Sequence, residues 1–154
     1  NRCLVGSEMC IRDRSIFILS IISNCYGEEI FLSLKKNKVN VRYGPSFDSP
    51  IKFINKKINL PIKQIDTKEN WKRIIDLKNN SGWIHQSQLK KNNSIIPTED
   101  KILFNKPLIF SKPIAKIKKG RVLVLLNCEN KWCKVKSNKF KGWIKTYNVW
   151  GKTK

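Results

Sequence analysis

Two cysteines and one histidine are the side chains of this sequence whose spacing first draws attention to possible chemistry. Cys128 and Cys133 are separated by four residues, and the single histidine is His85, within the segment GWIH. Two thiols at this spacing can form a disulfide or contribute to a metal site. Two cysteines without a histidine partner make a poor metal site, so we favour the disulfide and expect no metal. We expect His85 to face solvent on a strand.

The remaining polar residues do not form a recognisable catalytic set. An enzyme needs positioned acids, bases, nucleophiles or metal ligands. Asp66, Glu69 and Glu129 fall in expected turns, and the chain has neither a glycine-rich phosphate loop nor a G-x-S-x-G motif. Oxidation of both cysteines would also leave no Cys–His pair. We therefore predict a protein that is not an enzyme and that uses no cofactor.

The segment LNCENKWCKV has the form of a tight hairpin. A two-residue turn at positions 130–131 would place Cys128 opposite Cys133 as a closely spaced, non-hydrogen-bonded pair. That separation lies within the range that a disulfide can bridge. We predict a Cys128–Cys133 disulfide, with metal binding as the alternative.

The first 27 residues differ in character from the rest of the chain. Residues 1–14 contain LVGSEMCIRD, which matches a translation of a transposon-end adapter used in DNA sequencing, so we interpret them as an artefact. Residues 15–27 begin with an apolar run too short to span a bilayer and end with Cys25 and Gly27, small residues of the kind that signal peptidase reads. We expect a truncated signal peptide, a periplasmic location and no transmembrane segment in the mature chain. The alternatives are a genuine disordered tail and a buried strand.

The net charge of +21 favours an anionic partner, because a basic surface gains affinity by releasing counterions. This charge is mostly lysine and is spread along the whole chain. Specific nucleic-acid contacts depend mainly on arginine and aromatic clusters, and no arginine cluster is present. We interpret the charge as a solvated background and do not expect nucleic acid as a partner, while another anionic partner stays open.

A repeated tryptophan pattern divides the chain after residue 27 into two similar parts. Trp71 is followed twelve positions later by Trp83, and Trp132 is followed eleven positions later by Trp143. Both copies read W-x-x-[IV]…G-W-I and lie about sixty residues apart. Each copy consists of short β-rich runs separated by polar turns, and no window shows helical periodicity. The pattern predicts two small all-β barrels.

Polar and turn-forming residues mark the expected domain boundaries. We place the first domain at residues 30–90 and the second at 100–151, with a linker over 91–99 that lies within the segment KNNSIIPTED at 91–100. Trp83 and Trp143 are expected to pack in the two cores.

The first repeat opens with KVNVRYGPSFDSPI at residues 38–51. This segment resembles the V-N-[VL]-R-x-G-P-S signature of bacterial SH3-like domains. The second repeat lacks the signature but keeps Trp132, Gly142 and Trp143. The whole arrangement resembles a two-domain exported family of α-proteobacteria. The resemblance implies two tandem SH3-like β-barrels with a binding role, since such domains in envelope proteins commonly bind cell-wall peptides or other proteins.

The signature segment and the first tryptophan supply the predicted ligand-binding residues. In VNVR, residues 39 and 41 would face the core and residues 40 and 42 the outside. The aromatic residues that follow could line a groove for an extended peptide or a sugar. A purely structural role in building the loop is the alternative. The predicted binding residues are Asn40, Arg42, Tyr43, Phe47 and Trp71.

Together these features predict a non-catalytic periplasmic SH3-like binding protein that recognises peptidoglycan peptides or an envelope protein partner. Two other functions stay open at this point. One is a basic nucleic-acid-binding SH3-like protein, which the export signal disfavours. The other is the targeting module of a cell-wall hydrolase whose catalytic domain lies elsewhere.

Overall fold

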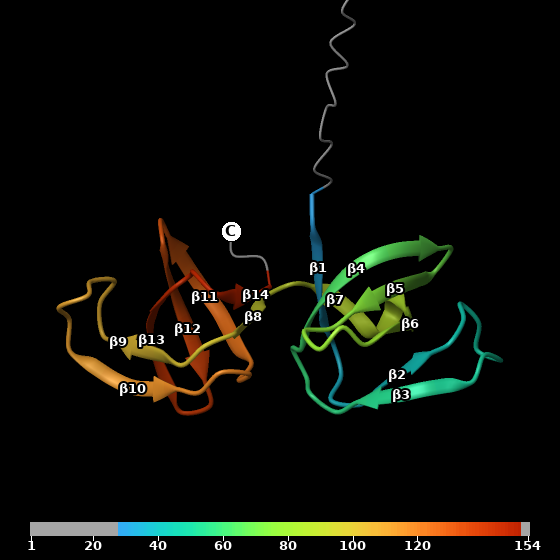
Figure 1. The fold of residues 1–154 in the computed structure, drawn as a ribbon, viewed down its shortest axis with the longest axis horizontal. Coiled ribbons are helices and arrows are strands. Elements are labelled where there is room, and N and C mark those ends of the chain that lie inside the picture. The colour runs from blue at the N-terminus through green and yellow to red at the C-terminus, as the bar shows by residue number, and fades with distance from the viewer. Residues whose placement is uncertain (1–27, 152–154) are drawn as a thin grey trace, which may run out of the picture.

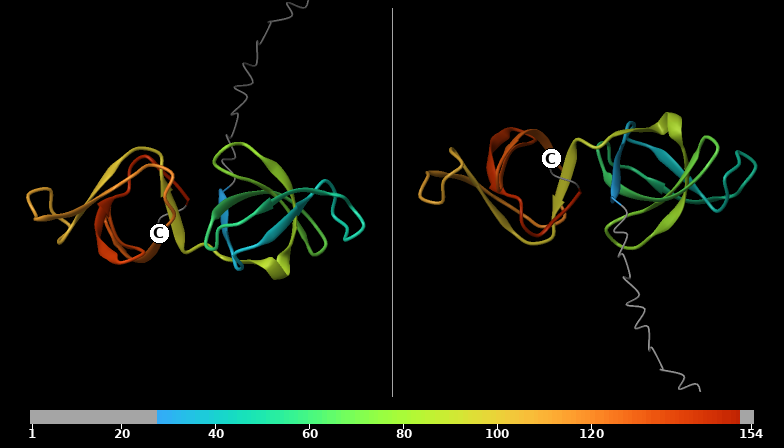
Figure 2. Two further views of the ribbon diagram at one scale, coloured as in Figure 1. Left: turned by 90° about the horizontal axis from the view of Figure 1, so that it is seen from below. Right: turned by 90° about the horizontal axis from the view of Figure 1, so that it is seen from above.

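Two seven-stranded antiparallel sheets make up the computed structural model, which describes residues 28–151. Each sheet curls into a small barrel, and the two barrels lie side by side with a short connection between them (Figures 1 and 2). The prediction of an all-β protein with two tandem barrels is confirmed. The proposed artefact at 1–14 and the proposed signal peptide at 15–27 lie outside the described residues.

The strands are short, as expected for small barrels. Those of the first sheet are β1 (Ile30–Leu34), β2 (Val39–Arg42), β3 (Ile51–Asn55), β4 (Pro61–Lys68), β5 (Trp71–Ile75), β6 (Ser81–His85) and β7 (Leu89–Lys91), with a 3-10 helix, η1 (Gln86–Gln88), before β7. Those of the second sheet are β8 (Ser94–Pro97), β9 (Lys101–Phe104), β10 (Pro113–Ile117), β11 (Leu123–Glu129), β12 (Trp132–Ser137), β13 (Phe140–Lys145) and β14 (Val149–Trp150).

The strand order is the same in both barrels. It runs β3-β2-β6-β5-β4-β1-β7 in the first sheet and β10-β9-β13-β12-β11-β8-β14 in the second. Each strand of the second sheet therefore occupies the place of the strand seven earlier in the chain. The repeat seen in the sequence extends to every strand of the fold.

Each barrel has its own aliphatic core. Val39 and Val41 are fully buried in the first core, as the alternation in VNVR predicts. Ile84 and Ile144 take the core positions at the ends of the two G-W-I motifs. Trp83 is only half-buried, so its expected core position is wrong: the residue after it points inward instead.

The glycine of each G-W-I motif lies where two strands come unusually close. A Cβ atom at Gly82 would lie 2.9 Å from the carbonyl oxygen of Arg42 and nearer still to Val41. A Cβ atom at Gly142 would lie 2.6 Å from the carbonyl oxygen of Phe104. The motif therefore uses glycine because the β2–β6 and β9–β13 crossings leave no space for a side chain.

The predicted linker over residues 91–99 is wrong in its central part. Strand β8 lies there, is buried at all four positions and pairs with β11 and β14. Ile95 is fully buried in the second core. The second barrel needs a strand equivalent to β1, and this segment supplies it. The connection that belongs to neither sheet is therefore very short.

Buried polar contacts join the two barrels next to that connection. The hydroxyl groups of Ser33 and Ser94 are hydrogen-bonded at 2.9 Å, and both residues are fully buried. The Ser94 hydroxyl also donates to the carbonyl oxygen of Asn59. On β14, which lies next to β8 at the same edge of the second sheet, the indole N–H of Trp150 donates to the carbonyl oxygen of Pro61 at 3.0 Å.

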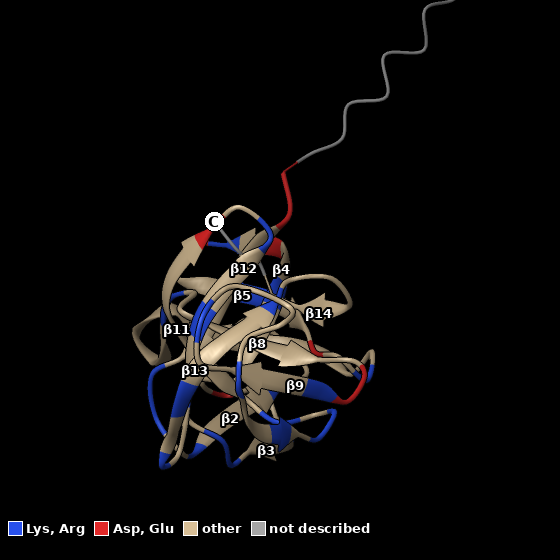
Figure 3. Cartoon of the chain, turned by 90° about the vertical axis from the view of Figure 1, so that its left-hand side faces the viewer, with Lys and Arg blue, Asp and Glu red and all other residues tan. Residues whose placement is uncertain are grey.

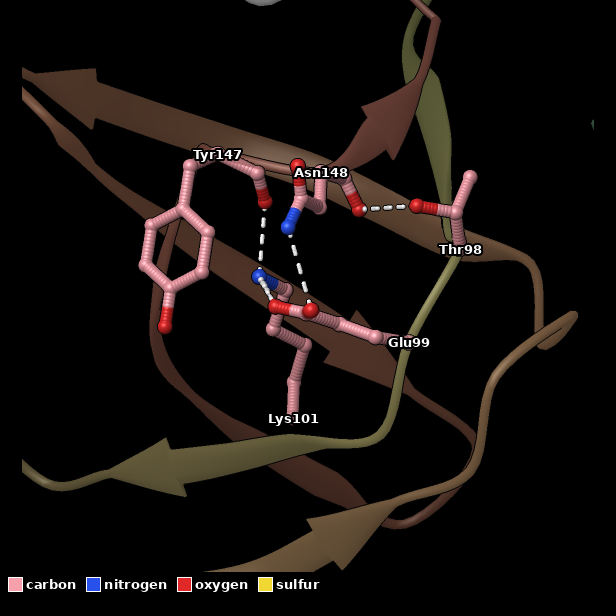
Figure 4. Close-up of polar contacts among 5 residues, drawn as sticks. All are labelled: Thr98, Glu99, Lys101, Tyr147 and Asn148. Atoms are coloured by element: carbon pink, nitrogen blue, oxygen red, sulfur yellow. Dashed lines mark hydrogen bonds and ion pairs between the residues drawn. The ribbon is translucent and has the colours of Figure 1, made fainter.

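A lysine inside the second barrel ties the start of β9 to the segment before β14. Lys101 is 4% exposed, and its ammonium group donates to Glu99 Oε1 and to the carbonyl oxygen of Tyr147, both at 2.7 Å (Figure 4). The ammonium also lies 3.4 Å from the centre of the Tyr147 ring. Asn148 donates to the second oxygen of Glu99. The hydrogen bond from Lys101 is the main reason that the pKa of Glu99 is lowered. These contacts satisfy a buried charge and give it a structural role.

The β11–β12 hairpin carries the predicted disulfide. Cys128 lies directly opposite Cys133 in the strand pair, with 4.1 Å between their Cα atoms, and the two are covalently joined. Asn130, in the two-residue turn, has a φ of 52°, a left-handed conformation that asparagine tolerates well. The predicted turn, register and disulfide are confirmed.

Reduction of this disulfide is expected to lower the free energy of unfolding by about 2 kcal/mol, because the bond closes only a short loop in the unfolded chain. Urea unfolding with and without a thiol reductant measures the difference. The Cys128→Ala/Cys133→Ala variant is the control and should not respond to the reductant. Equal stability of the oxidised and reduced wild-type protein would contradict the prediction.

Asp100 is expected to make stability depend on acid pH. The backbone N–H of Lys119, followed by the ammonium groups of Lys118 and Lys116, lowers the pKa of Asp100 from its ordinary 3.8 to about 2. A lowered pKa in the folded state means that the charged carboxylate stabilises the fold above the ordinary pKa, and that this contribution disappears as pH falls from about 4 to about 2. In urea unfolding at pH 6, 4 and 2, the stability gap between wild type and Asp100→Asn should shrink with falling pH. A gap that does not change with pH would refute this role.

Candidate functional site

The first barrel presents a row of large side chains on the outer side of its sheet. Arg42 on β2 lies opposite Trp83 on β6, and Trp83 lies opposite Arg73 on β5. Directly opposed residues of antiparallel strands point to the same side of a sheet. Val41 and Ile74 point to the other side, into the core. The row therefore faces outward and alternates cationic and aromatic groups.

Three rings cluster at one end of this row. The ring of Phe47 lies 4.9 Å from that of Trp71 and 5.1 Å from that of His85, and the Trp71 and His85 rings are 5.3 Å apart. Phe47 is 62% exposed, whereas Trp71 is 7% exposed. Phe47 therefore covers Trp71, and its own outer face is exposed to solvent. We call the outward row and this cluster the first aromatic face, formed by Arg42, Phe47, Trp71, Arg73, Trp83 and His85.

The loop that carries Phe47 is closed by Arg42. The Arg42 guanidinium donates to the carbonyl oxygen of Ser49, and the backbone N–H of Tyr43 donates to that of Pro50 at 3.1 Å. A Cβ atom at Gly44 would lie 2.7 Å from the Ser49 hydroxyl, so this tight loop suits glycine. The signature residues therefore build the loop, and the loop presents the exposed ring of Phe47.

The structure brings together some of the predicted binding residues and separates others. Arg42, Phe47 and Trp71 share the first aromatic face. Tyr43 is 65% exposed, but its ring lies against the ammonium of Lys52 at 5.4 Å. Asn40 is half-buried in the β2–β3 pair. A ligand-binding role for these five residues stays a prediction.

Sequence reasoning placed His85 in solvent on its own and missed its membership of the cluster. His85 lies opposite Trp71 in the β5–β6 pair, which sets its ring beside the indole. Its Nδ1 atom lies 2.8 Å from the Ser87 hydroxyl and caps η1. The available signal was its position two residues after Trp83, because alternate strand residues share a face.

The second barrel repeats this arrangement with different cations. Trp143 lies opposite both Phe104 and Lys134, and Trp132 lies opposite Lys145. The Phe104 and Trp132 rings are 5.7 Å apart. The ammonium of Lys134 lies 5.8 Å from the Trp143 ring, and that of Lys145 lies 5.7 Å from the Trp132 ring. We call these five residues the second aromatic face.

A loop with an apolar tip borders the second aromatic face. Residues 105–112 and Trp132 line a cleft of about 650 Å³. Leu108 and Ile109 are each more than half exposed, and Phe110 is completely exposed. Sequence reasoning assigned no binding residue here because the SH3-like signature is absent from this repeat. The signal that could have found this face is Trp132, which occupies the position of Trp71 in the repeated pattern.

Two properties of residues 28–151 bear on the kind of site present. No group of three or more His, Cys, Asp or Glu side chains in this part of the chain is arranged to hold a metal ion. No helix among the same residues is long and apolar enough to cross a membrane. The side chains that the two faces offer are aromatic rings and cations, which suit noncovalent binding.

Comparison with solved structures finds distant likenesses. NlpC2 and NlpC1 from Trichomonas vaginalis match with 10% and 12% sequence identity, each with a TM-score of 0.37, over 82% and 88% of this chain. An NlpC/P60 family protein from Bacillus cereus matches with 12% identity and a TM-score of 0.36 over 77% of this chain. The matches cover 49%, 51% and 55% of those three proteins, so the chain spans about half of their length. No curated protein sequence matches the chain.

Comparison with protein families gives a clear result. The bacterial SH3 domain matches twice, at residues 35–91 and 102–151, which together make up more than half of the chain. Each match covers most of one barrel and includes its pair of tryptophans. The expected resemblance is confirmed, and the chain belongs to the bacterial SH3 domain family, with two copies of the domain in tandem.

Proposed function

We propose that this protein is a non-catalytic binding protein of the periplasm whose two aromatic faces hold an extended ligand, either a peptidoglycan peptide or an envelope protein. One observation carries the proposal: equivalent strand positions of both barrels place tryptophans and cations on the outer side of the sheet, where Trp83 and Trp132 are half-buried while Trp71 and Trp143 are buried, at 7% and 9% exposure. Trp71 and Trp83 in the first barrel correspond to Trp132 and Trp143 in the second.

The chemistry of the faces fits such a ligand. Aromatic rings bind the apolar parts of an extended chain and lose little conformational entropy on binding. The cations beside them can pair with carboxylates, which wall peptides carry. Arg73 provides this group on the first face, and Lys134 and Lys145 provide it on the second.

Membership of the bacterial SH3 family supports the general class, since these domains are typically binding modules and often bind cell-wall components. The periplasmic part of the proposal rests on two observations. The apolar run within residues 15–27 has the length of a signal-peptide core. The Cys128–Cys133 disulfide suits an oxidising compartment.

The proposal predicts that residues 28–151 bind to purified peptidoglycan sacculi or capture a protein from an envelope extract. Phe47→Ala should weaken this binding about tenfold, because loss of a central aromatic contact commonly costs a complex that much. Trp132→Ala tests the second face in the same way. Co-sedimentation with sacculi and affinity capture from the extract measure the two possible ligands.

Phe140→Ala is the matched control, because Phe140 is 50% exposed and belongs to neither face. It should bind like wild type. Circular dichroism of each variant separates loss of binding from loss of folding. Failure of the wild-type protein to bind both sacculi and envelope proteins, or normal binding by the folded Phe47→Ala and Trp132→Ala variants, would overturn the proposal.

A further inference from the structure

A cleft of about 770 Å³ lies between the two barrels, and no residue of either aromatic face lines it. Residues 56–59, which follow β3, form one wall, and residues 118–122, which precede β11, form the other. Lys136 on β12 and Asn138 complete the second wall. The cleft needs both barrels in this orientation, which the buried Ser33–Ser94 contact supports.

The charged groups of the cleft all have the same sign. No aspartate or glutamate lines it. Lys118 forms an ion pair with Asp100, and no other lining cation has a carboxylate oxygen within 4.0 Å among the described residues. All of these cations are exposed at the surface. They are Lys56, Lys57, Lys118, Lys119, Arg121 and Lys136.

Concavity distinguishes this cleft from the rest of a basic surface. Lysine and arginine are spread widely over the molecule, with few acidic residues among them (Figure 3). On a convex surface such charges repel one another only weakly, because water separates and screens them. In a cleft with low-dielectric walls, charges of one sign focus the field and raise the local concentration of a counter-ion.

We propose that this cleft binds an anion that carries several phosphate groups close together. Five of its six cations are lysines, which bind phosphate as compact point charges, whereas the two-pronged recognition of carboxylates is typical of arginine. Cations contributed from both walls would contact such an anion at the same time. Binding would therefore hold the two barrels together.

The lining does not favour nucleic acid. Single-stranded nucleic acids bind where bases stack on aromatic rings, and no aromatic residue lines the cleft. The single arginine, Arg121, offers little for reading base edges. The apolar part of the lining is Ile58, Val122 and Val124, which are aliphatic. The lining of the cleft therefore suits an anion with a high density of negative charge and is not suited to recognising nucleic-acid bases.

Isothermal titration calorimetry with tripolyphosphate tests the proposal on the full chain. Wild type should bind, and Lys57→Gln/Arg121→Gln, which removes one exposed cation from each wall, should bind at least about tenfold more weakly. Lys68→Gln/Lys131→Gln makes the same change in net charge at two exposed lysines away from the cleft and should bind within about twofold of wild type. In NMR spectra, tripolyphosphate should shift signals of both walls, around residues 56–59 and 118–122.

Two further arms distinguish the source of the phosphates. Co-sedimentation with phosphatidylcholine vesicles that contain cardiolipin, a lipid with two phosphates, reports a lipid headgroup, whereas binding of tripolyphosphate alone reports a soluble ligand. Either result supports phosphate binding in the cleft if the Lys57→Gln/Arg121→Gln variant loses the binding and the control double variant keeps it. Three results would overturn it: no binding of either probe, equal losses in both double variants, or tighter binding of an oligonucleotide with as many phosphates. Failure here leaves the aromatic faces untouched, since their test uses other variants and other ligands.

Discussion

The buried hydroxyl pair of Ser33 and Ser94 sets the relation between the two halves of this molecule. Two domains on one chain normally move relative to one another unless their interface is specific or large. Here both hydroxyls are excluded from water and form a hydrogen bond across the junction. Separating the barrels would break this hydrogen bond, and displacing one hydroxyl while the other stays buried would leave a buried polar group without this partner. Trp150 adds a second attachment, since its ring packs edge-on against Phe31 at 5.2 Å while its N–H bonds to Pro61. The cleft between the barrels and the relative placement of the aromatic faces follow from these contacts.

Within each barrel, the same register produces an equivalent outer face with different chemistry. The close strand crossings at Gly82 and Gly142 fix which residues stand opposite each other. In both copies the tryptophans then lie on the outer side of the sheet, one of each pair half-buried and the other buried. The first face combines its rings with arginine and histidine, whereas the second places lysines over its rings. The two faces thus share one arrangement of strands but differ in their charged side chains. Under the proposed function, this difference would suit two different parts of one extended ligand, or two ligands.

Much of the fold was predictable because its signals are local. Alternation in VNVR, the spacing of the tryptophans and the hairpin of the cysteines each concern residues close in sequence, and the structure confirms them. The linker prediction failed over β8 because a short strand beside asparagines and a proline has the composition of a loop, and only its pairing with β11 makes it a strand. The membership of His85 and Trp132 in the faces depends on cross-strand register, which the sequence shows only indirectly. The cationic cleft could not be predicted, since its walls come from segments about sixty residues apart whose meeting depends on how the barrels dock.

Residual dipolar couplings of backbone amides test most directly whether the two barrels form one unit. Couplings measured in a weakly aligned sample give the orientation and degree of order of each barrel separately. The contacts of Ser33, Ser94 and Trp150 predict that one alignment tensor fits residues 30–91 and 94–151 together. Tensors of clearly different magnitude or orientation for the two barrels would contradict this account.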